Sequence, residues 1–237
     1  MPNSLPKFSR PAAVSKIKTQ ADIVFCIDAT GSMQPCIDGV KQGIGALVEG
    51  LKTTANVDYR LRLVGFRDKH DPTAAHEPWT LTEFTPDAED FLGRLGDLQA
   101  FGGGDAPESS LDALYLAIHS DWRRRGTYKC VVLLTDEDAH PTLHSSTYSR
   151  PDNTIARVIQ DFQELSHVML HMIVPRLPIY EWIEASMVSA ERKIVARFVP
   201  YHLTDRRYQG LAAVDWTETM LNLGRTVSAS SLSAIDA

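Results

Sequence analysis

Residues 22–32, Asp-Ile-Val-Phe-Cys-Ile-Asp-Ala-Thr-Gly-Ser, decide the fold of this chain. A continuous apolar run that ends in a carboxylate predicts a strand that is buried on both faces. A second run of this kind, residues 129–136, also ends in an aspartate. Strands buried on both faces are typical of parallel sheets that carry helices on either side.

Strand-like and helix-like segments alternate along the rest of the chain. Periodicity predicts strands over residues 22–28, 57–66, 79–84, 129–136, 168–174 and 194–200. Apolar residues at helical spacing predict helices over residues 33–53, 87–98, 108–124, 153–166, 178–190 and 207–222. This order predicts an α/β fold, a three-layer, doubly wound and mainly parallel six-stranded sheet. Ligands of such sheets bind beyond the carboxyl ends of the strands, where the strand order reverses.

Length and composition favour one folded domain. The chain has 237 residues, of which 43% are hydrophobic, enough for one core and too few for two comfortable domains. We expect a flexible segment over residues 1–19 and a single domain over residues 20–223. The Ser/Ala-rich residues 224–237 are expected to form a disordered tail.

Charge and cysteine content restrict the partners and the compartment. A net charge of −6 gives no general electrostatic reason to bind nucleic acid or an anionic membrane. The densest basic cluster, Arg123–Arg125, is expected at the end of a helix, where cations suit the helix dipole. No run is apolar enough for a membrane helix or a signal peptide. The odd count of 3 cysteines, in apolar surroundings, favours reduced thiols and a cytoplasmic protein.

Asp28, Thr30 and Ser32 follow the first strand at positions i, i+2 and i+4. In an extended or gently turning loop, this spacing sends three oxygen-bearing side chains to one side. One carboxylate and two hydroxyls suit a hard cation such as Mg²⁺, which prefers oxygen ligands and keeps several waters. A strand end followed by a helix N-cap shows the same pattern, so the pattern alone does not decide.

Two further acidic motifs strengthen the metal interpretation. Residues 102–108 read Gly-Gly-Gly-Asp-Ala-Pro-Glu, and Asp136 ends the second apolar strand. If residues 22–28 and 129–136 form neighbouring strands, Asp28, Asp105 and Asp136 approach one crevice. Three such carboxylates repel one another and raise their own pKa values, and a bound divalent cation removes that repulsion.

These motifs resemble the metal loops of von Willebrand factor A domains. Residues 25–33, Phe-Cys-Ile-Asp-Ala-Thr-Gly-Ser-Met, resemble the D-x-S/T-x-S loop of the metal-ion-dependent adhesion site. Residues 102–108 resemble the second loop in its G-G-G-D-x-P-E form, seen in many intracellular and microbial members. Residues 133–136, Leu-Leu-Thr-Asp, resemble the third loop, and the match covers about residues 20–200.

The resemblance implies an antiparallel edge strand at residues 79–84 and a role for each matching side chain. Asp28, Thr30 and Ser32 would approach the metal directly or through water, and Asp136 mainly through water. Asp105 stands where adhesion receptors carry a threonine. Its extra negative charge is expected to strengthen metal binding and to weaken the pull on an acidic partner.

Other polar residues near these loops are weaker candidates. Asp68, Glu108 and Asp138 are predicted to support the site from outside the metal shell or to contact a partner. For Asp68, a solvated loop explains the sequence equally well. Asp138, His140 and His144 also suggest a soft-metal site. The pair His140-x₃-His144 is isolated and no partner cysteine completes a site, so zinc is the less favoured interpretation.

The resemblance implies a protein–protein interaction module, an adaptor or scaffold that binds an acidic or oxygen-bearing partner through Mg²⁺, or through Mn²⁺ or Ca²⁺. Intracellular members often work beside AAA+ ATPases, protein kinases or phosphatases, so such a partner is expected. The alternative is a Mg²⁺-dependent hydrolase or phosphatase, because aspartyl-phosphate enzymes place their nucleophile at the end of the first strand. Those enzymes usually carry a carboxylate two residues later, where this chain has Thr30. A phosphate-binding G-x-x-x-x-G-K-[ST] loop is absent from the sequence.

Overall fold

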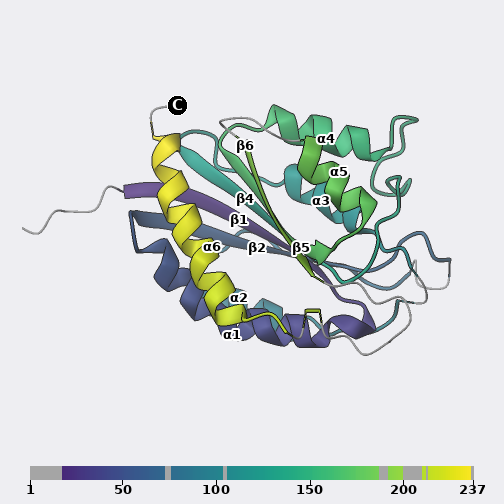
Figure 1. Cartoon of the computed structure of the whole chain (residues 1–237), viewed down its shortest axis with the longest axis horizontal. Coiled ribbons are helices and arrows are strands. Elements are labelled where there is room, and N and C mark those ends of the chain that lie inside the picture. Colours follow the sequence, from purple (N-terminus) through teal and green to yellow (C-terminus); the bar gives the residue numbers. More distant parts are fainter. Residues whose placement is uncertain are drawn as a thin grey trace, which may run out of the picture.

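The computed structural model describes residues 18–72, 76–103, 106–186, 192–199, 210–211 and 213–235. Within these residues the centre is a six-stranded sheet in the order β3-β2-β1-β4-β5-β6 (Figure 1). Its strands are β1 (Lys18–Asp28), β2 (Asn56–Phe66), β3 (Thr80–Leu81), β4 (Thr127–Leu134), β5 (Val168–Pro175) and β6 (Arg192–Val199). Neighbouring strands are parallel except β3, which pairs antiparallel with β2 at the edge. The predicted doubly wound, mainly parallel sheet is therefore confirmed.

Helices cover both faces of the sheet. Figure 1 shows α1 (Gln34–Leu51), α2 (Ala88–Asp97) and α6 (Trp216–Ser230) on one side. The opposite side carries α3 (Ser110–Ile118), α4 (Ile155–Glu164) and α5 (Pro178–Ser186). Each layer of helices buries its own apolar core against the sheet. None of the described helices is long and apolar enough to cross a membrane.

The apolar run of β1 divides its side chains between the two cores. Ile23, Phe25 and Ile27 point into the core under α1 and α6, and Val24 and Cys26 point into the other. All five side chains are fully buried. Burying a large apolar side chain stabilises a fold by about 1.5–3 kcal/mol, so this one strand contributes to both layers. The three cysteines are free and buried, as the sequence suggested.

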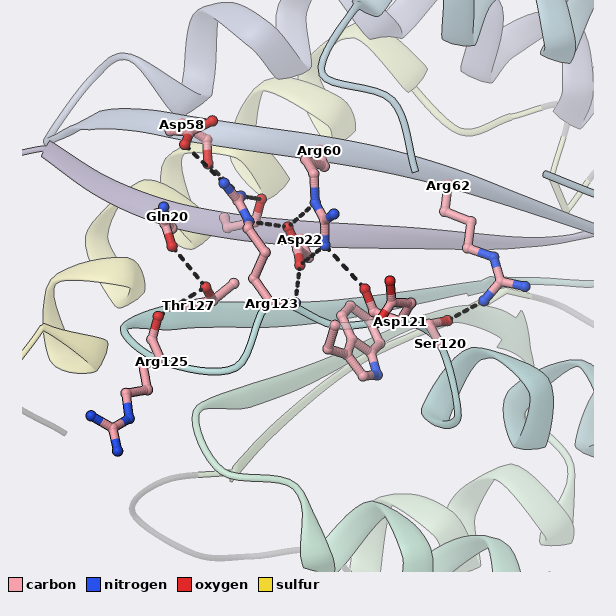
Figure 2. Close-up of polar contacts among 12 residues, drawn as sticks. Gln20, Asp22, Asp58, Arg60, Arg62, Ser120, Asp121, Arg123, Arg125 and Thr127 are labelled. Atoms are coloured by element: carbon pink, nitrogen blue, oxygen red, sulfur yellow. Dashed lines mark hydrogen bonds and ion pairs between the residues drawn. The ribbon is translucent and has the colours of Figure 1, made fainter. Parts of the chain in front are cut away.

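The amino ends of the parallel strands meet at a buried ionic cluster around Asp22 (Figure 2). Asp22 accepts hydrogen bonds from Nε and Nη2 of Arg60 at 3.0 and 2.7 Å. The backbone N–H and Nε of Arg123 also donate to Asp22, each at 2.9 Å. Nη1 of Arg123 reaches Asp58 at 2.8 Å. The cluster ties β1, β2 and the loop before β4 together.

This cluster corrects two predictions about residues 108–126. The helix ends at Ile118 rather than near residue 124, and the indole N–H of Trp122 then donates to the carbonyl of Ile118 at 2.8 Å. Residues 123–125 therefore lie beyond the helix and do not serve its dipole. Arg123 turns inward to Asp22, while Arg125 points away from the cluster in Figure 2.

The C-terminal segment also differs from the prediction. A helix was expected over residues 207–222 and a disordered tail over residues 224–237. Residues 201–209 lie outside the described part of the chain, but α6 runs to Ser230 and a 3₁₀ helix, η2, spans Ser231–Ala234. Val227 and Ala234 are fully buried in the core beneath α1. The prediction of a disordered tail is therefore wrong for residues 224–235. The small residues in this segment allow close packing between α6 and α1.

The predicted edge strand at residues 79–84 is shorter than expected. Only Thr80–Leu81 pair regularly with β2, opposite Gly65 and Val64. Beyond them, the N–H of Thr82 still donates to the carbonyl of Leu63 at 3.0 Å. An isolated antiparallel bridge joins Thr85 to Leu61, so the segment follows β2 without forming a continuous ladder.

Candidate metal centre

The predicted crevice lies where β1 and β4 run side by side. The two strands are parallel, and Ile27 lies opposite Leu134 in their register. The chain leaves β1 for α1 and β2 on one side and reaches β4 on the other, so the strand order reverses here. Asp28 and the Thr135–Asp136 pair consequently emerge at the same edge of the sheet.

Asp28 is fully buried at this point and is held by three hydrogen bonds. Its Oδ1 accepts from the backbone N–H of Thr30 at 2.9 Å and from the Thr30 hydroxyl at 2.7 Å. Its Oδ2 accepts from the hydroxyl of Thr135 at 2.7 Å. Burial raises the pKa of Asp28, and the hydrogen bonds from Thr30 and Thr135 partly oppose that rise. The three hydrogen bonds thus fix the orientation of the Asp28 carboxylate without any ligand.

Thr30, Ser32 and Asp136 lie around Asp28. Thr30 is the N-cap of a short 3₁₀ helix, η1 (Gly31–Met33), which carries Ser32 on its exposed side. Burial and the charge of Asp28 raise the pKa of Asp136 to about 7, against a hydrogen bond from Ser32 that lowers it. The structure therefore brings together four of the five predicted metal residues.

The second predicted loop packs directly against the first. The N–H of Phe101 donates to the carbonyl of Ala29 at 3.0 Å, and the N–H of Gly31 donates to the carbonyl of Gly102 at 3.1 Å. Gly103 has a φ of +75°, and a Cβ there would lie 2.7 Å from Cβ of Thr30. Only glycine allows this approach without strain. Asp105 lies outside the described residues, so its metal role stays a prediction.

Glu108 contributes a further buried acid. Its side chain is almost fully buried, and its Oε2 has no hydrogen-bond partner within the described residues. Burial, and then the charges of Asp28, Asp68 and Asp136, raise the pKa of Glu108 to about 10. Its N–H donates to the carbonyl of Asp138 at 2.8 Å. Asp138 therefore contacts this loop through its backbone, while its carboxylate accepts from the N–H of Ala139 at 2.8 Å.

Asp68 joins three loops rather than pointing into the crevice unpartnered. Its Oδ1 accepts from the N–H of His70 at 2.8 Å and from the hydroxyl of Ser109 at 3.1 Å. The same oxygen lies 3.0 Å from Nε2 of His140. Because Ser109 follows Glu108 in sequence, these bonds fix the backbone that carries the buried glutamate. The contacts are those of a supporting residue.

Arg67, which was not predicted from the sequence, holds the second loop in place. Arg67 is almost fully buried, and its Nη2 donates to the carbonyl of Gln99 at 2.7 Å. Another N–H of the guanidinium donates to the carbonyl of Pro78. The guanidinium also lies 3.9 Å from the ring centroid of Phe101. Its only signal in the sequence was its position directly after an apolar strand.

The donor set fits a divalent cation. Asp28, Asp136 and Glu108 are acids with raised pKa values, and a cation at their centre would relieve both burial and repulsion. Thr30 and Ser32 add neutral oxygen donors, which hard cations accept. No group of three or more His, Cys, Asp or Glu side chains in the described residues is arranged as a metal site. A cation here would therefore depend on the hydroxyls and on water as well as on carboxylates.

Comparison with known proteins identifies the family. Residues 22–167 match the family model described as von Willebrand factor A domain. The chain belongs to this family. Among solved structures, a von Willebrand factor type A protein from Catenulispora acidiphila has a TM-score of 0.54 at 15% identity, covering 89% of this chain and 43% of that one. The SpRpn10 VWA domain has a TM-score of 0.51 at 13% identity, covering 82% and 93% respectively.

A curated relative is larger than this von Willebrand factor A chain. The alpha-protein kinase vwkA of Dictyostelium discoideum is 30% identical over 132 residues, which is 55% of this chain. The match spans 20% of the kinase, so most of that protein has no counterpart in the alignment. The two solved structures share the fold with this chain at low identity.

Proposed function

We propose that this von Willebrand factor A domain is a divalent-cation-dependent protein interaction module. The cation, Mg²⁺ in the first instance, sits among Asp28, Thr30, Ser32 and Asp136, with Asp105 contributing from the second loop. A partner protein supplies an aspartate, a glutamate or another oxygen donor to the coordination position that remains open. The domain thereby acts as an adaptor or scaffold.

The state of Asp28 carries this proposal. A fully buried carboxylate, oriented by two threonine hydroxyls, stands beside two acids whose pKa values are raised. Such crowding of acids costs free energy unless protons or a cation neutralise them. When bound, the cation supplies positive charge and an electrophilic position for an oxygen ligand. The fold of this chain fixes the positions of these acids and keeps the hydroxyls of Thr30 and Thr135 within hydrogen-bond distance of Asp28.

A Mg²⁺-dependent hydrolase at the same crevice is the less favoured alternative. An aspartyl-phosphate mechanism needs a carboxylate oxygen that reaches the substrate. The position two residues after Asp28, where such enzymes usually carry a second carboxylate, is Thr30, whose hydroxyl donates to Asp28 at 2.7 Å. We therefore expect no turnover of a generic phosphoester such as p-nitrophenyl phosphate in the presence of Mg²⁺.

The kind of partner is proposed from the family relationship. The curated relative is named as a protein kinase and carries the matching segment within one polypeptide. We propose that this domain binds a component of a kinase system in trans. AAA+ ATPase and phosphatase systems are the other candidates.

Calorimetric titration of metal-stripped protein with MgCl₂ and MnCl₂ tests the cation site. We expect one-site binding that disappears in Asp28→Asn, which keeps the side-chain volume and can still accept the bonds from Thr30. Asp90→Asn, an exposed aspartate on α2, is the matched control and should bind like the wild type. A folded Asp28→Asn variant that binds Mg²⁺ with unchanged affinity would contradict the proposed site.

A second assay separates the cation site from the partner. The wild type and Asp28→Asn are immobilised and exposed to candidate kinase-system proteins in Mg²⁺ or in EDTA. Binding that requires both Mg²⁺ and Asp28 supports the interaction module. Binding that is equal in Mg²⁺ and EDTA would place the partner on a cation-independent surface.

A further inference from the structure

β6 forms an open edge of the sheet in the described part of the chain. It is the last strand in the sheet order and pairs only with β5 (Figure 1). On its outer side, alternate backbone N–H and C=O groups therefore have no strand partner among the described residues. Such unpaired groups are a template for a further strand, and proteins usually protect them.

The two edges of the sheet differ in this protection. At the other edge, only Thr80–Leu81 pair regularly with β2, so the exposed ladder is short. β6 runs for 8 residues, Arg192–Val199, in unbroken one-to-one register with Val168–Pro175. It contains no proline, and its regular register excludes a bulge. β6 thus lacks two common means of protecting an edge strand.

The side chains of β6 alternate between the two faces of the sheet. The core under α3, α4 and α5 receives Ile194, Ala196 and Phe198. Lys193, Val195 and Arg197 lie on the opposite face and are exposed, Val195 to 38%. An apolar side chain therefore lies between two cations on the exposed face of the edge strand.

These two cations have no acidic partner among the described residues. Nζ of Lys193 donates to the hydroxyl of Ser230 at 3.4 Å, and Nη1 of Arg197 donates to the hydroxyl of Thr219 at 2.8 Å. Both partners belong to α6 and are neutral, so they do not compensate the positive charges. A cavity of about 570 Å³ opens beside Lys193 and is also lined by Arg225, which adds a further cation.

The charges argue against a second copy of β6 as the occupant of this edge. In an antiparallel pair centred on Val195, Lys193 of one copy would lie opposite Arg197 of the other. In a parallel pair, each cation would lie opposite the same cation of the second copy. Like charges directly opposite each other destabilise a strand pair, and opposite charges stabilise it. The complementary strand is therefore acidic.

We propose that the open edge of β6 binds an extended acidic segment of a partner protein, which adds a seventh strand to the sheet. Its side chains at i, i+2 and i+4 would be acidic, apolar and acidic, opposite Lys193, Val195 and Arg197. Backbone pairing supplies affinity in such complexes, and the alternate side chains supply specificity. β4 and β5 separate this edge from β1, which carries Asp28, so the inference does not depend on the proposed cation site.

Two fluorescein-labelled peptides of equal composition test this edge on the full chain in EDTA. In Thr-Glu-Thr-Val-Thr-Glu-Thr, both acids share a face with the valine, and in Thr-Thr-Glu-Val-Glu-Thr-Thr they lie on the other face. Both sequences are symmetric about the valine, so each fits either strand direction. We expect saturable binding of the first peptide by fluorescence anisotropy, and roughly 10-fold weaker binding of the second.

Charge reversal on the protein provides the matched variants. Lys193→Glu combined with Arg197→Glu should weaken binding of the first peptide by roughly 10-fold or more and create binding of Thr-Lys-Thr-Val-Thr-Lys-Thr. Arg124→Glu combined with Arg150→Glu alters two exposed arginines outside β6 and changes the net charge equally. This control should bind the first peptide like the wild type. Bound peptide should also slow hydrogen exchange of the β6 amides.

The proposal is overturned if neither acidic peptide binds, or if both bind alike, since net charge alone would then explain binding. It is also overturned if bound peptide leaves hydrogen exchange in β6 unchanged. Dimers of the free chain in sedimentation, with β6 amides already protected, would assign the edge to a second copy instead. Circular dichroism confirms that each variant is folded, which the exposure of Lys193 and Arg197 leads us to expect.

Discussion

At the scale of single residues, burial sets the ionisation of the acids around Asp28. The pKa of Asp136 is raised to about 7 and that of Glu108 to about 10, mainly by burial. Both pKa values exceed those of the same groups in the unfolded chain. At any pH between the unfolded and the folded pKa of a group, the folded protein therefore binds more protons than the unfolded chain. Without a divalent cation, the contribution of these groups to stability is therefore highest below pH 3.8 for Asp136 and below pH 4.5 for Glu108, and it falls as pH rises toward their folded pKa values.

Substitution of Glu108 tests this account. Glu108→Gln removes an acid that is ionised in the unfolded chain and protonated in the folded one at pH 8. We expect its free energy of unfolding in EDTA to rise by roughly 1–3 kcal/mol at pH 8 and to change little at pH 4.5. Urea unfolding at the two pH values measures this, with the exposed Glu49→Gln as control. A loss of stability at pH 8 would show that Glu108 is ionised in the fold.

Residue-scale prediction from sequence worked where the relevant atoms are close along the chain. Asp28 and Thr30 are two positions apart, and their hydrogen bond follows from the loop pattern. The bond from Thr135 to Asp28 spans 107 positions, and Arg67 reaches across 32 positions to Gln99. Such partners depend on which strands and loops become neighbours.

At the scale of elements, α1 and α6 approach each other through glycines. A Cβ on Gly224 would lie 2.3 Å from the carbonyl oxygen of Leu47, and one on Gly50 would lie 2.4 Å from that of Leu221. Contacts this close between backbones leave no space for a methyl group. The small residues of both helices therefore determine how deeply α6 sits on α1.

An alanine at Gly224 should separate these helices. We expect Gly224→Ala to destabilise the protein by about 1–3 kcal/mol, although alanine favours the helix more than glycine does. Gly45→Ala, on the open side of α1 with nothing within 4 Å, is the matched control. It should stabilise the protein by up to about 1 kcal/mol. Equal effects of the two substitutions in urea unfolding would contradict the close contact.

The strands were predicted better than the helix ends. Residues 22–28 and 129–136 were easy to predict as strands because every residue in these two runs is buried. α3 ends at Ile118, and the chain beyond it bonds to Asp22 through the N–H of Arg123, a partner 101 positions away in the sequence. The side chain of Asp215 caps the start of α6 by accepting from the N–H of Glu218 at 2.9 Å. The rest of α6, as far as Ser230, packs against α1 through glycines, which the composition of residues 224–237 conceals.

At the scale of the whole molecule, the two ends of the parallel strands have different roles. The carboxyl ends of β1 and β4 carry the crowded acids of the candidate centre. The amino ends carry the Asp22 cluster, whose charges are matched by Arg60 and Arg123 (Figure 2). One end of the sheet thus carries crowded acids, and its other end is held together by paired charges.

The C-terminal segment closes this end of the molecule, and its removal should unfold or strongly weaken the domain. The hydroxyl of Ser228 accepts from the N–H groups of Thr54 and Ala55 at 3.2 and 3.0 Å, and Ser231 bonds to Thr19 at 2.8 Å. Val227, which precedes Ser228 in α6, is fully buried in the core. A chain ending after Leu223 should lose at least about 3 kcal/mol relative to one ending after Ile235. Urea unfolding of the two truncations decides this, since equal stability would mean that residues 224–235 add nothing to the core.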